Sequence, residues 1–109
     1  MTAGGQTPEE LETLLEDAFV LRDALALARL FQRGGILAVG GQPPACGRDS
    51  IARTALPLWA REHRYLAAPR QIYQVRDTAL VISDSAVNVA RRGRDRSWRY
   101  AVAALDGPA

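Results

Sequence analysis

Few residues of this sequence are of the types that move protons at neutral pH. His63 is the single histidine, and its imidazole has an unperturbed pKa close to neutrality, as a general base requires. Charged residues surround it at the polar end of a predicted helix, namely Arg61, Glu62 and Arg64. A histidine in such a place commonly faces solvent near helix carbonyls, so we expect His63 to lie outside any catalytic site.

Cys46 is the only cysteine, and it stands beside Gly47 and Arg48 in a proline-rich loop. A nearby guanidinium group or a helix N-terminus could lower the pKa of its thiol and make it reactive. No candidate base is adjacent, so an unreactive thiol is the simpler expectation. One cysteine can form no internal disulfide, which fits a reducing compartment, and we expect a cytoplasmic location.

Asp84 follows a predicted strand over residues 78–83 whose side chains alternate between two faces. It falls in line with the bulkier apolar residues of that strand, Leu80 and Ile82. If this face bordered a cavity, desolvation would raise the pKa of the Asp84 carboxyl and suit it to proton transfer. The alternative is that Asp84 caps the turn it forms with Ser85 by accepting hydrogen bonds from backbone amides.

Large aromatic side chains with a polar end can line a cavity for a flat apolar ligand and orient it. The candidate ligand-binding residues of this kind are Trp59, Tyr73 and Tyr100. Packing in the hydrophobic core is the alternative for each of them. We expect Trp98 to be core, on one strand face with Tyr100 and Val102.

Composition limits the classes of partner. The chain has 109 residues, enough for one domain, and a net charge of +2, so we expect no nucleic-acid partner. All fourteen basic residues are arginine, and the run from Arg91 to Arg96 lies in a predicted hairpin, where a solvated loop is the simpler interpretation than a phosphate-binding surface. The longest apolar stretches, such as residues 24–30, are too short to span a bilayer, so no membrane partner is expected. No phosphate-binding glycine loop or cluster of metal ligands is present in the sequence, so neither a cofactor nor a metal is expected.

Apolar periodicity predicts helices in the first half of the chain. Thr7, Pro8 and Glu10 read as an N-cap, a first helical residue and a capping-box acid. A second helix is predicted from Asp23 to the glycine pair at 34–35, and a third from about Asp49, interrupted or kinked at Pro57. The remaining expectations are a short strand at 36–39, a loop at 40–47, and disorder at residues 1–6.

Strand-like patterns follow in the second half. They cover Gln71 to Val75, Thr78 to Ser83, Val87 to Arg91 and Trp98 to Leu105. Helices first and closely spaced strands afterwards predict an α+β fold, an antiparallel sheet with helices packed on one face.

Four segments in this order resemble the SnoaL-like and steroid-isomerase-like branch of the nuclear transport factor 2-like superfamily. Leu21 to Ala24 looks like the family's step into its second helix, with Arg22 where glycine is usual. Gly47 to Ile51 is similar to the start of its third helix, and Val75 to Asp84 to its "Gly-Asp-Thr-Ala-Leu" strand. Val89 to Tyr100 resembles its last two strands, although the usual "Asp-Gly-x-Trp-Arg" turn is altered.

The resemblance implies one cone-shaped α+β (cystatin-like) domain over residues 1–109 with an apolar pocket, and a homodimer. Two functions stay open: a binding or structural module for a small apolar ligand, and a cofactor-independent isomerase, dehydratase or polyketide cyclase-like enzyme. In the enzyme, Asp84 would move a proton while Tyr73 or Tyr100 stabilised an oxyanion. The stretch from Ser83 to Val87 is shorter than the family pattern by about a hairpin, so a shallower pocket is expected.

Overall fold

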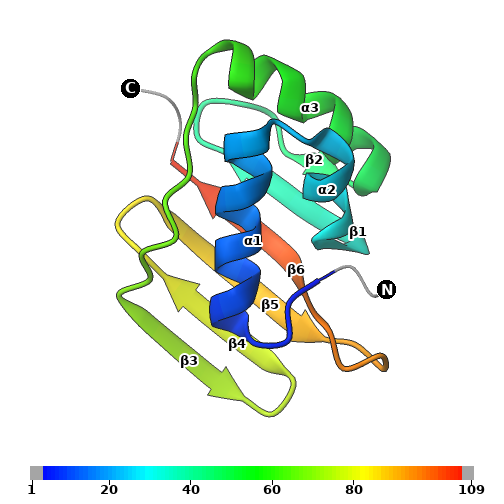
Figure 1. The fold of residues 1–109 in the computed structure, drawn as a ribbon, viewed down its shortest axis with the longest axis vertical. Helices are drawn as coiled ribbons and strands as arrows, with labels where there is room; N and C mark the ends of the chain where they lie inside the picture. The colour runs from blue at the N-terminus through cyan, green and yellow to red at the C-terminus, as the bar shows by residue number, and fades with distance from the viewer. Residues whose placement is uncertain (1–3, 107–109) are drawn as a thin grey trace.

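The computed structural model describes residues 4–106, which form three helices and one six-stranded sheet (Figure 1). The helices are α1 (Pro8–Leu21), α2 (Ala24–Arg29) and α3 (Arg48–Ala60). The strands are β1 (Phe31–Val39), β2 (Ala45–Cys46), β3 (Gln71–Val75), β4 (Thr78–Ile82), β5 (Ala86–Arg92) and β6 (Trp98–Leu105). All three helices lie on one face of the sheet, α1 across its middle and α2 and α3 over β1 and β2. The predicted α+β class is confirmed.

The sheet is mixed, with strand order β2-β1-β6-β5-β4-β3. Every neighbouring pair is antiparallel except β1 and β6, which run parallel from Ile36↔Val102 to Val39↔Leu105. The short turns of the second half predict only antiparallel pairing. The chain between β1 and β6 contains α3 and four strands, which is long enough to bring β6 back in the same direction.

The chain between α2 and β1 differs from the sequence prediction. The second helix was predicted to continue to the glycines at 34–35, but α2 ends at Arg29 and β1 begins at Phe31. The Leu30 carbonyl accepts a hydrogen bond of 2.7 Å from the Tyr100 amide, and Phe31 pairs with Tyr100. Pairing with β6 therefore overrides the helical periodicity of this segment.

The ends of the helices follow the sequence signals more closely. The Thr7 hydroxyl accepts a hydrogen bond of 3.0 Å from the Glu10 amide, which confirms the predicted N-cap of α1. Pro57 lies inside α3 and removes one backbone donor, yet the helix continues to Ala60. The predicted loop at 40–47 is also corrected, because its end forms the short strand β2 against β1.

Gly5, within the stretch 1–6 for which disorder was expected, contacts the sheet. Gly5 forms an antiparallel bridge with Trp98, with N···O distances of 3.0 and 2.7 Å. Residues 1–3 of that prediction lie outside the described residues. The bridge covers part of the β6 backbone next to the start of α1.

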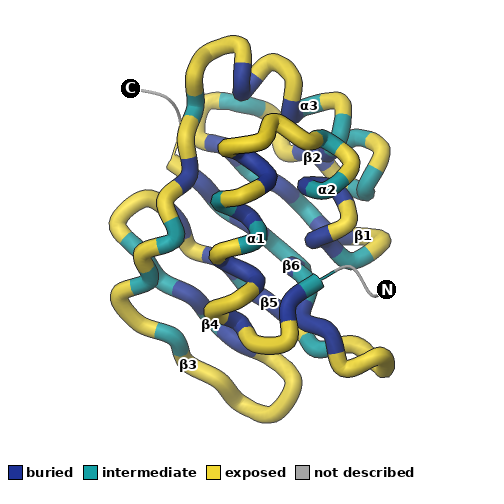
Figure 2. Tube along the Cα trace, viewed as in Figure 1, coloured by how far each residue is buried: buried dark blue, intermediate teal, exposed yellow. Residues whose placement is uncertain are grey.

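The core fills the space between the helices and the sheet, as the buried stretches of β5 and β6 beneath α1 show (Figure 2). Small residues face α1 from the sheet, which lets the helix approach closely: Ala79, Val81, Ala90 and Ala103. Within residues 4–106, no helix combines the length and the apolar character that crossing a bilayer requires.

A β-bulge in β6 decides which of its side chains face the helices. Ala90 pairs with Tyr100 and Val89 pairs with Val102, so Ala101 is the extra residue. Tyr100 and Ala103 are consequently both buried, although they are three residues apart. Val102 therefore lies on the opposite face from Tyr100, whereas the sequence alternation predicted one shared face.

Candidate functional site

A buried carboxylate lies between α1 and the sheet. Glu12 belongs to the stripe of α1 that faces the sheet, in helical register with Pro8, Leu15 and Phe19, and its side chain is only 1% exposed. Most carboxylates on a short amphipathic helix face solvent, and a buried one requires hydrogen-bond partners. The sheet supplies these partners.

Three polar side chains converge on Glu12. The Tyr65 hydroxyl donates to Oε1, and the Tyr100 hydroxyl donates to Oε2. The Asn88 amide donates to Oε2 at 3.0 Å and to the Tyr65 hydroxyl at 3.1 Å. We call Glu12, Tyr65, Asn88 and Tyr100 the Glu12 cluster.

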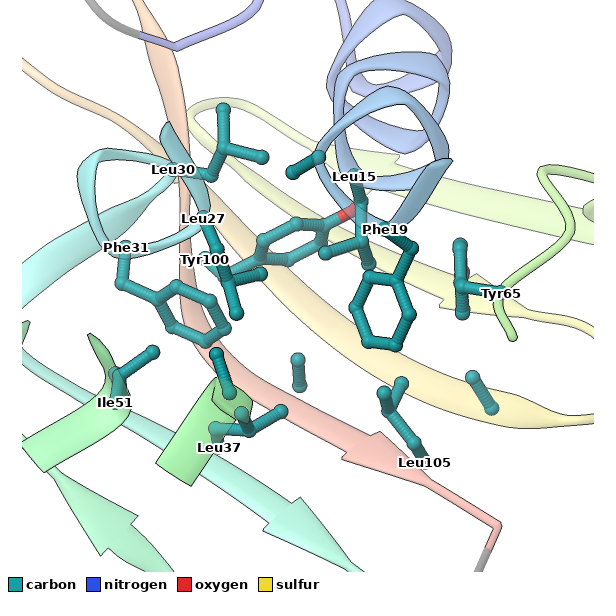
Figure 3. Packing of buried hydrophobic residues seen from close by; sticks show 14 of the residues in the cluster. Leu15, Phe19, Leu27, Leu30, Phe31, Leu37, Ile51, Tyr65, Tyr100 and Leu105 are labelled. Carbon is teal, nitrogen blue, oxygen red and sulfur yellow. The ribbon is translucent and has the colours of Figure 1, made fainter. Parts of the chain in front are cut away.

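The Glu12 cluster is fixed from several elements. Asn88 on β5 uses its carbonyl oxygen to accept from the Ala104 amide of β6 at 3.2 Å, so its side-chain nitrogen points towards α1. Tyr100 reaches Glu12 because the bulge at Ala101 keeps it on the helix side. Figure 3 shows the Tyr100 ring beneath α1 with its hydroxyl directed at the helix.

The hydroxyl groups of the cluster hold their protons firmly. Burial, together with the hydrogen bond to Glu12 and its negative charge, raises the pKa of Tyr65 far above its ordinary value. Burial and the charge of Glu12 likewise raise the pKa of Tyr100. Both phenols are therefore donors at neutral pH, and the carboxylate is their acceptor.

A pocket of about 440 Å³ opens beside the Glu12 cluster, between the end of α1 and residues 62–66. Its apolar lining comes from Phe19, Val20 and Leu66, and Tyr65 connects it with the cluster. The polar lining is Glu16, Arg22, Glu62, His63 and Arg64. Glu16 is held in place, because its Oε1 accepts from the Ala67 amide at 2.8 Å.

An aromatic cluster forms the inner wall of this pocket around Phe19. Its ring lies 5.9 Å from that of Trp59, edge to face, and 6.0 Å from those of His63 and Tyr65. Trp59 Nε1 and His63 Nε2 are both buried and have no hydrogen-bond partner among residues 4–106. Desolvation lowers the pKa of His63, so its imidazole is neutral at pH 7.

The sequence matches no family model and no curated protein. Solved structures with the same architecture exist. A ketosteroid isomerase-like protein from Erwinia carotovora atroseptica superposes with a TM-score of 0.73 at 18% identity, covering 93% of both chains. An NTF2-like protein with a cystatin-like fold from Novosphingobium aromaticivorans has a TM-score of 0.69 at 24% identity, over 90% of this chain and 77% of that one.

This chain has the nuclear transport factor 2-like (NTF2-like) fold. A further structural neighbour, a protein from Catenulispora acidiphila, was solved in complex with S-DNPA and has a TM-score of 0.69 at 18% identity, over 90% of this chain and 88% of that one. These identities are too low to transfer a reaction, so any function has to be argued from the residues of this chain.

Asp84 lies away from the enclosed side of the NTF2-like sheet. Its carboxylate pairs with the Arg70 guanidinium at 2.8 Å, and the Asp84 side chain is 77% exposed. The face of β4 that carries Leu80 and Ile82 is the one turned away from the helices, whereas Ala79 and Val81 are buried beneath α1. The burial on which the predicted proton-transfer role depended is therefore absent at Asp84.

The three predicted pocket aromatics lie in three different environments. Tyr100 is buried in the Glu12 cluster, and Trp59 is buried behind Phe19. Tyr73 is 53% exposed on β3 at the sheet edge, where its hydroxyl donates to the Gln71 side chain at 2.8 Å. The structure thus brings Trp59 and Tyr100 towards the core side of the fold and leaves Tyr73 outside it.

Two residues that sequence analysis set aside occupy different places from those expected. His63 packs on Phe19 and lines the pocket instead of facing solvent. Cys46 is an exposed, free thiol on β2. Within residues 4–106, no three His, Cys, Asp or Glu side chains are grouped to hold a metal ion.

Sequence analysis missed Glu12, which is the centre of the polar cluster. A signal was present, because Glu12 falls on the apolar stripe of α1, four residues after Pro8 and three before Leu15. A single charged residue on such a stripe indicates a buried polar partner. Tyr65 offered no such signal, since it lies in a segment without regular periodicity.

Proposed function

We propose that this chain binds a small, mainly apolar molecule in the pocket between the end of α1 and residues 62–66. The observation that carries the proposal is the pocket itself, about 440 Å³ in volume, with an aromatic inner wall and a few polar groups at its rim. Small-molecule sites have this composition, in which apolar walls supply affinity and a few polar groups supply orientation.

The pocket wall is held rigidly enough to be pre-formed. Tyr65 lies in the extended segment after α3, where its hydroxyl is held by hydrogen bonds to Glu12 and Asn88 and its ring packs on Phe19. The Glu16–Ala67 hydrogen bond anchors the same segment to α1. Two residues of α1, Glu12 and Glu16, therefore hold Tyr65 and Ala67 in place by hydrogen bonds. This limits the conformational entropy that this part of the pocket wall loses on binding.

A titration with N-phenyl-1-naphthylamine, a neutral fluorophore that brightens in apolar sites, tests the binding function. We expect saturable binding of one molecule per chain. Val20→Glu places a charge in the pocket lining and should weaken binding by about tenfold or more. Val75→Glu is the matched control, because Val75 on β3 is as exposed as Val20, each at 73%.

The outcome separates a pocket from general hydrophobic adsorption. Loss of affinity in Val20→Glu with normal affinity in Val75→Glu supports the pocket. Non-saturable fluorescence, or an equal loss in both variants, would contradict the proposal.

We also propose that the chain forms a homodimer through the sheet face opposite the helices. The register places one apolar row across this face, Leu80–Val89–Val102–Ile36, and a second row of Ile82, Val87, Ala104 and Ala38 beside it. Val87 is 48% exposed, and none of the three helices covers this side. A broad apolar sheet face left in water favours association, and a second copy presents an identical, self-complementary face.

Sedimentation analysis of the wild type and of Val89→Asp tests the dimer. We expect a concentration-dependent dimer for the wild type and a folded monomer for the variant, because the new carboxylate would be buried at the interface without a partner. Thr13→Asp, an exposed change on α1, is the control and should leave the dimer intact. A wild type that stays monomeric at high concentration contradicts this proposal.

An enzymatic function is the second candidate, as a cofactor-independent isomerase or dehydratase. The specific observation in its favour is Glu16, a half-buried carboxylate in the pocket lining whose second oxygen has no hydrogen bond from residues 4–106. A carboxylate positioned beside a bound ligand can remove a proton from carbon as a general base. Glu16 replaces Asp84 as the carboxylate of this hypothesis.

A turnover assay with unsaturated cyclic ketones, followed by proton exchange in deuterated buffer, tests the enzyme candidate. Glu16→Gln should abolish exchange while N-phenyl-1-naphthylamine still binds. Asp17→Asn, an exposed change one residue away, should retain exchange. Equal rates in Glu16→Gln and the wild type would exclude Glu16 as the base.

A further inference from the structure

Two residues that pack on Phe19 each carry a buried polar atom with no hydrogen-bond partner among residues 4–106. They are Trp59 in the last turn of α3, with Nε1, and His63, three residues after α3 ends, with Nε2. Buried polar atoms are nearly always hydrogen-bonded, and each one left without a partner destabilises the folded protein. Two such atoms on residues that pack against one pocket-lining side chain call for a functional explanation.

Phe19 lies between the Trp59 indole and the pocket. Its ring packs edge to face on Trp59, which is not part of the pocket lining, whereas Phe19 and its other neighbour His63 both line the pocket. Figure 3 shows that the Phe19 side chain projects from α1 and lies between those of Tyr100 and Tyr65. It lies three residues before Arg22, the left-handed C-cap at which α1 ends, so rotation of its side chain disturbs no following helical turn.

We propose that Phe19 is a gate, and that a ligand which displaces it places an oxygen against Trp59 Nε1. The inference rests on the small-molecule binding proposed above and names the ligand chemistry. The indole N–H is a donor only, so its ligand partner must be an acceptor, such as a ketone or carboxylate oxygen. His63, which also packs on Phe19 and lines the pocket, provides a second polar contact to this oxygen or to its neighbour.

The size of the displaced group fits this role. A phenyl ring that swings out leaves a flat, aromatic-lined space next to the existing pocket, so the ligand is a planar apolar molecule with one acceptor group at its inner end. Such a ligand replaces the contacts of the Phe19 ring and in addition satisfies the Trp59 indole N–H, which has no partner among residues 4–106. The hydrogen bond to Trp59 Nε1 is therefore the source of the expected selectivity for ligands that carry an acceptor oxygen.

A matched pair of probes tests the gate. 2-Acetylnaphthalene and 2-isopropylnaphthalene have nearly the same shape, but only the first carries an accepting oxygen. Competition against N-phenyl-1-naphthylamine gives both affinities. We expect the ketone to bind about tenfold more tightly to the wild type, the ratio that one satisfied buried donor supplies. In Trp59→Phe the ratio should fall to about one, and in Phe19→Ala both probes should bind more tightly.

The nuclear magnetic resonance signal of the Trp59 indole N–H gives a readout that does not depend on how well a variant folds. The ketone should move this signal downfield in the wild type, while the hydrocarbon should not. The indole N–H signal of Trp98 is the internal control and should not move. Trp98 is buried on β6 and contacts Arg92 of β5. Tyr73→Phe at the sheet edge should retain the tenfold ratio.

Each outcome decides the question. Equal affinities of the two probes for the wild type, or a ketone preference that survives in a folded Trp59→Phe, overturns the gate while leaving the binding pocket intact. If N-phenyl-1-naphthylamine and both probes fail to bind at all, the proposed binding function itself is wrong. A ketone preference with a displaced Trp59 signal supports both.

Discussion

The two faces of the sheet show how differently one set of strands can be used. The face beneath α1 combines small apolar residues with the Glu12 cluster, and its polar atoms are hydrogen-bonded to one another. The opposite face carries larger apolar residues, such as Leu80 and Val89, yet none of the three helices covers it. Residue size alone therefore misidentifies the enclosed face, because close approach of a helix selects for small side chains there.

Residues on the two faces also contribute differently to the stability of the folded protein and to its association. A polar group on the enclosed face must have its partners in place, since water cannot replace them. An apolar group on the outer face contributes little to the folded monomer and much to association. Substitutions on the two faces should accordingly affect different measurements.

The largest effect is expected from Glu12→Gln. The substitution keeps the shape of the side chain but turns one acceptor into a donor that faces the hydroxyl or amide donors of the cluster. We expect a loss of about 3 kcal/mol in the free energy of unfolding, measured by urea denaturation. Asp17→Asn on the exposed side of α1 should change it by less than about 0.5 kcal/mol. A Glu12→Gln protein as stable as the wild type would mean that the cluster contributes nothing to the fold.

The second largest effect is expected where a larger side chain is introduced on the enclosed face of the sheet, and not on the outer face. Ala90 is fully buried beneath α1, so Ala90→Leu should overpack the core and cost about 2 kcal/mol. Val87, on the same strand and facing outwards, should accept leucine within about 0.5 kcal/mol. Chemical denaturation of both variants checks the prediction, and equal losses would show that α1 does not pack closely on β5.

Alkaline pH should weaken the enclosed face selectively. Because the folded state raises the pKa of Tyr65 and Tyr100 above the ordinary value of 10.0, the stability that their protonated forms provide is complete below pH 10.0 and is lost as the pH rises beyond it. Thermal melts between neutral pH and about pH 11 should show a falling midpoint. Tyr100→Phe should flatten this fall, whereas Tyr73→Phe should not.

Mild acid should produce the smallest effect. Desolvation places the pKa of His63 in the folded state below 6.5, so its contribution to stability is present above pH 6.5 and declines as the pH falls through and below that value. The unfolding midpoint of the wild type should therefore drop slightly more than that of His63→Gln between pH 7 and about pH 5.5. Parallel curves for the two proteins would show that His63 faces solvent after all.

The sequence predicted local features with an unambiguous chemical signal. Thr7, Pro8 and Glu10 mark the start of α1, and the bounds of β3 and β6 match those expected from alternation and turn residues. The candidate site was less predictable. Trp59 and Tyr100 were named as aromatics that line a pocket, but Glu12 was hidden because a carboxylate on a helix is ordinarily solvated.

The sequence by itself determined the α+β class, the capped first helix and the order of elements, because caps, turns and periodicity act over a few neighbouring residues. The tertiary structure decided which sheet face is enclosed, where α2 gives way to β1, and that Glu12, Tyr65, Asn88 and Tyr100 meet. These outcomes depend on contacts between distant segments. The bulge at Ala101 and the parallel pairing of β1 with β6 determine them, and neither leaves a local trace in the sequence.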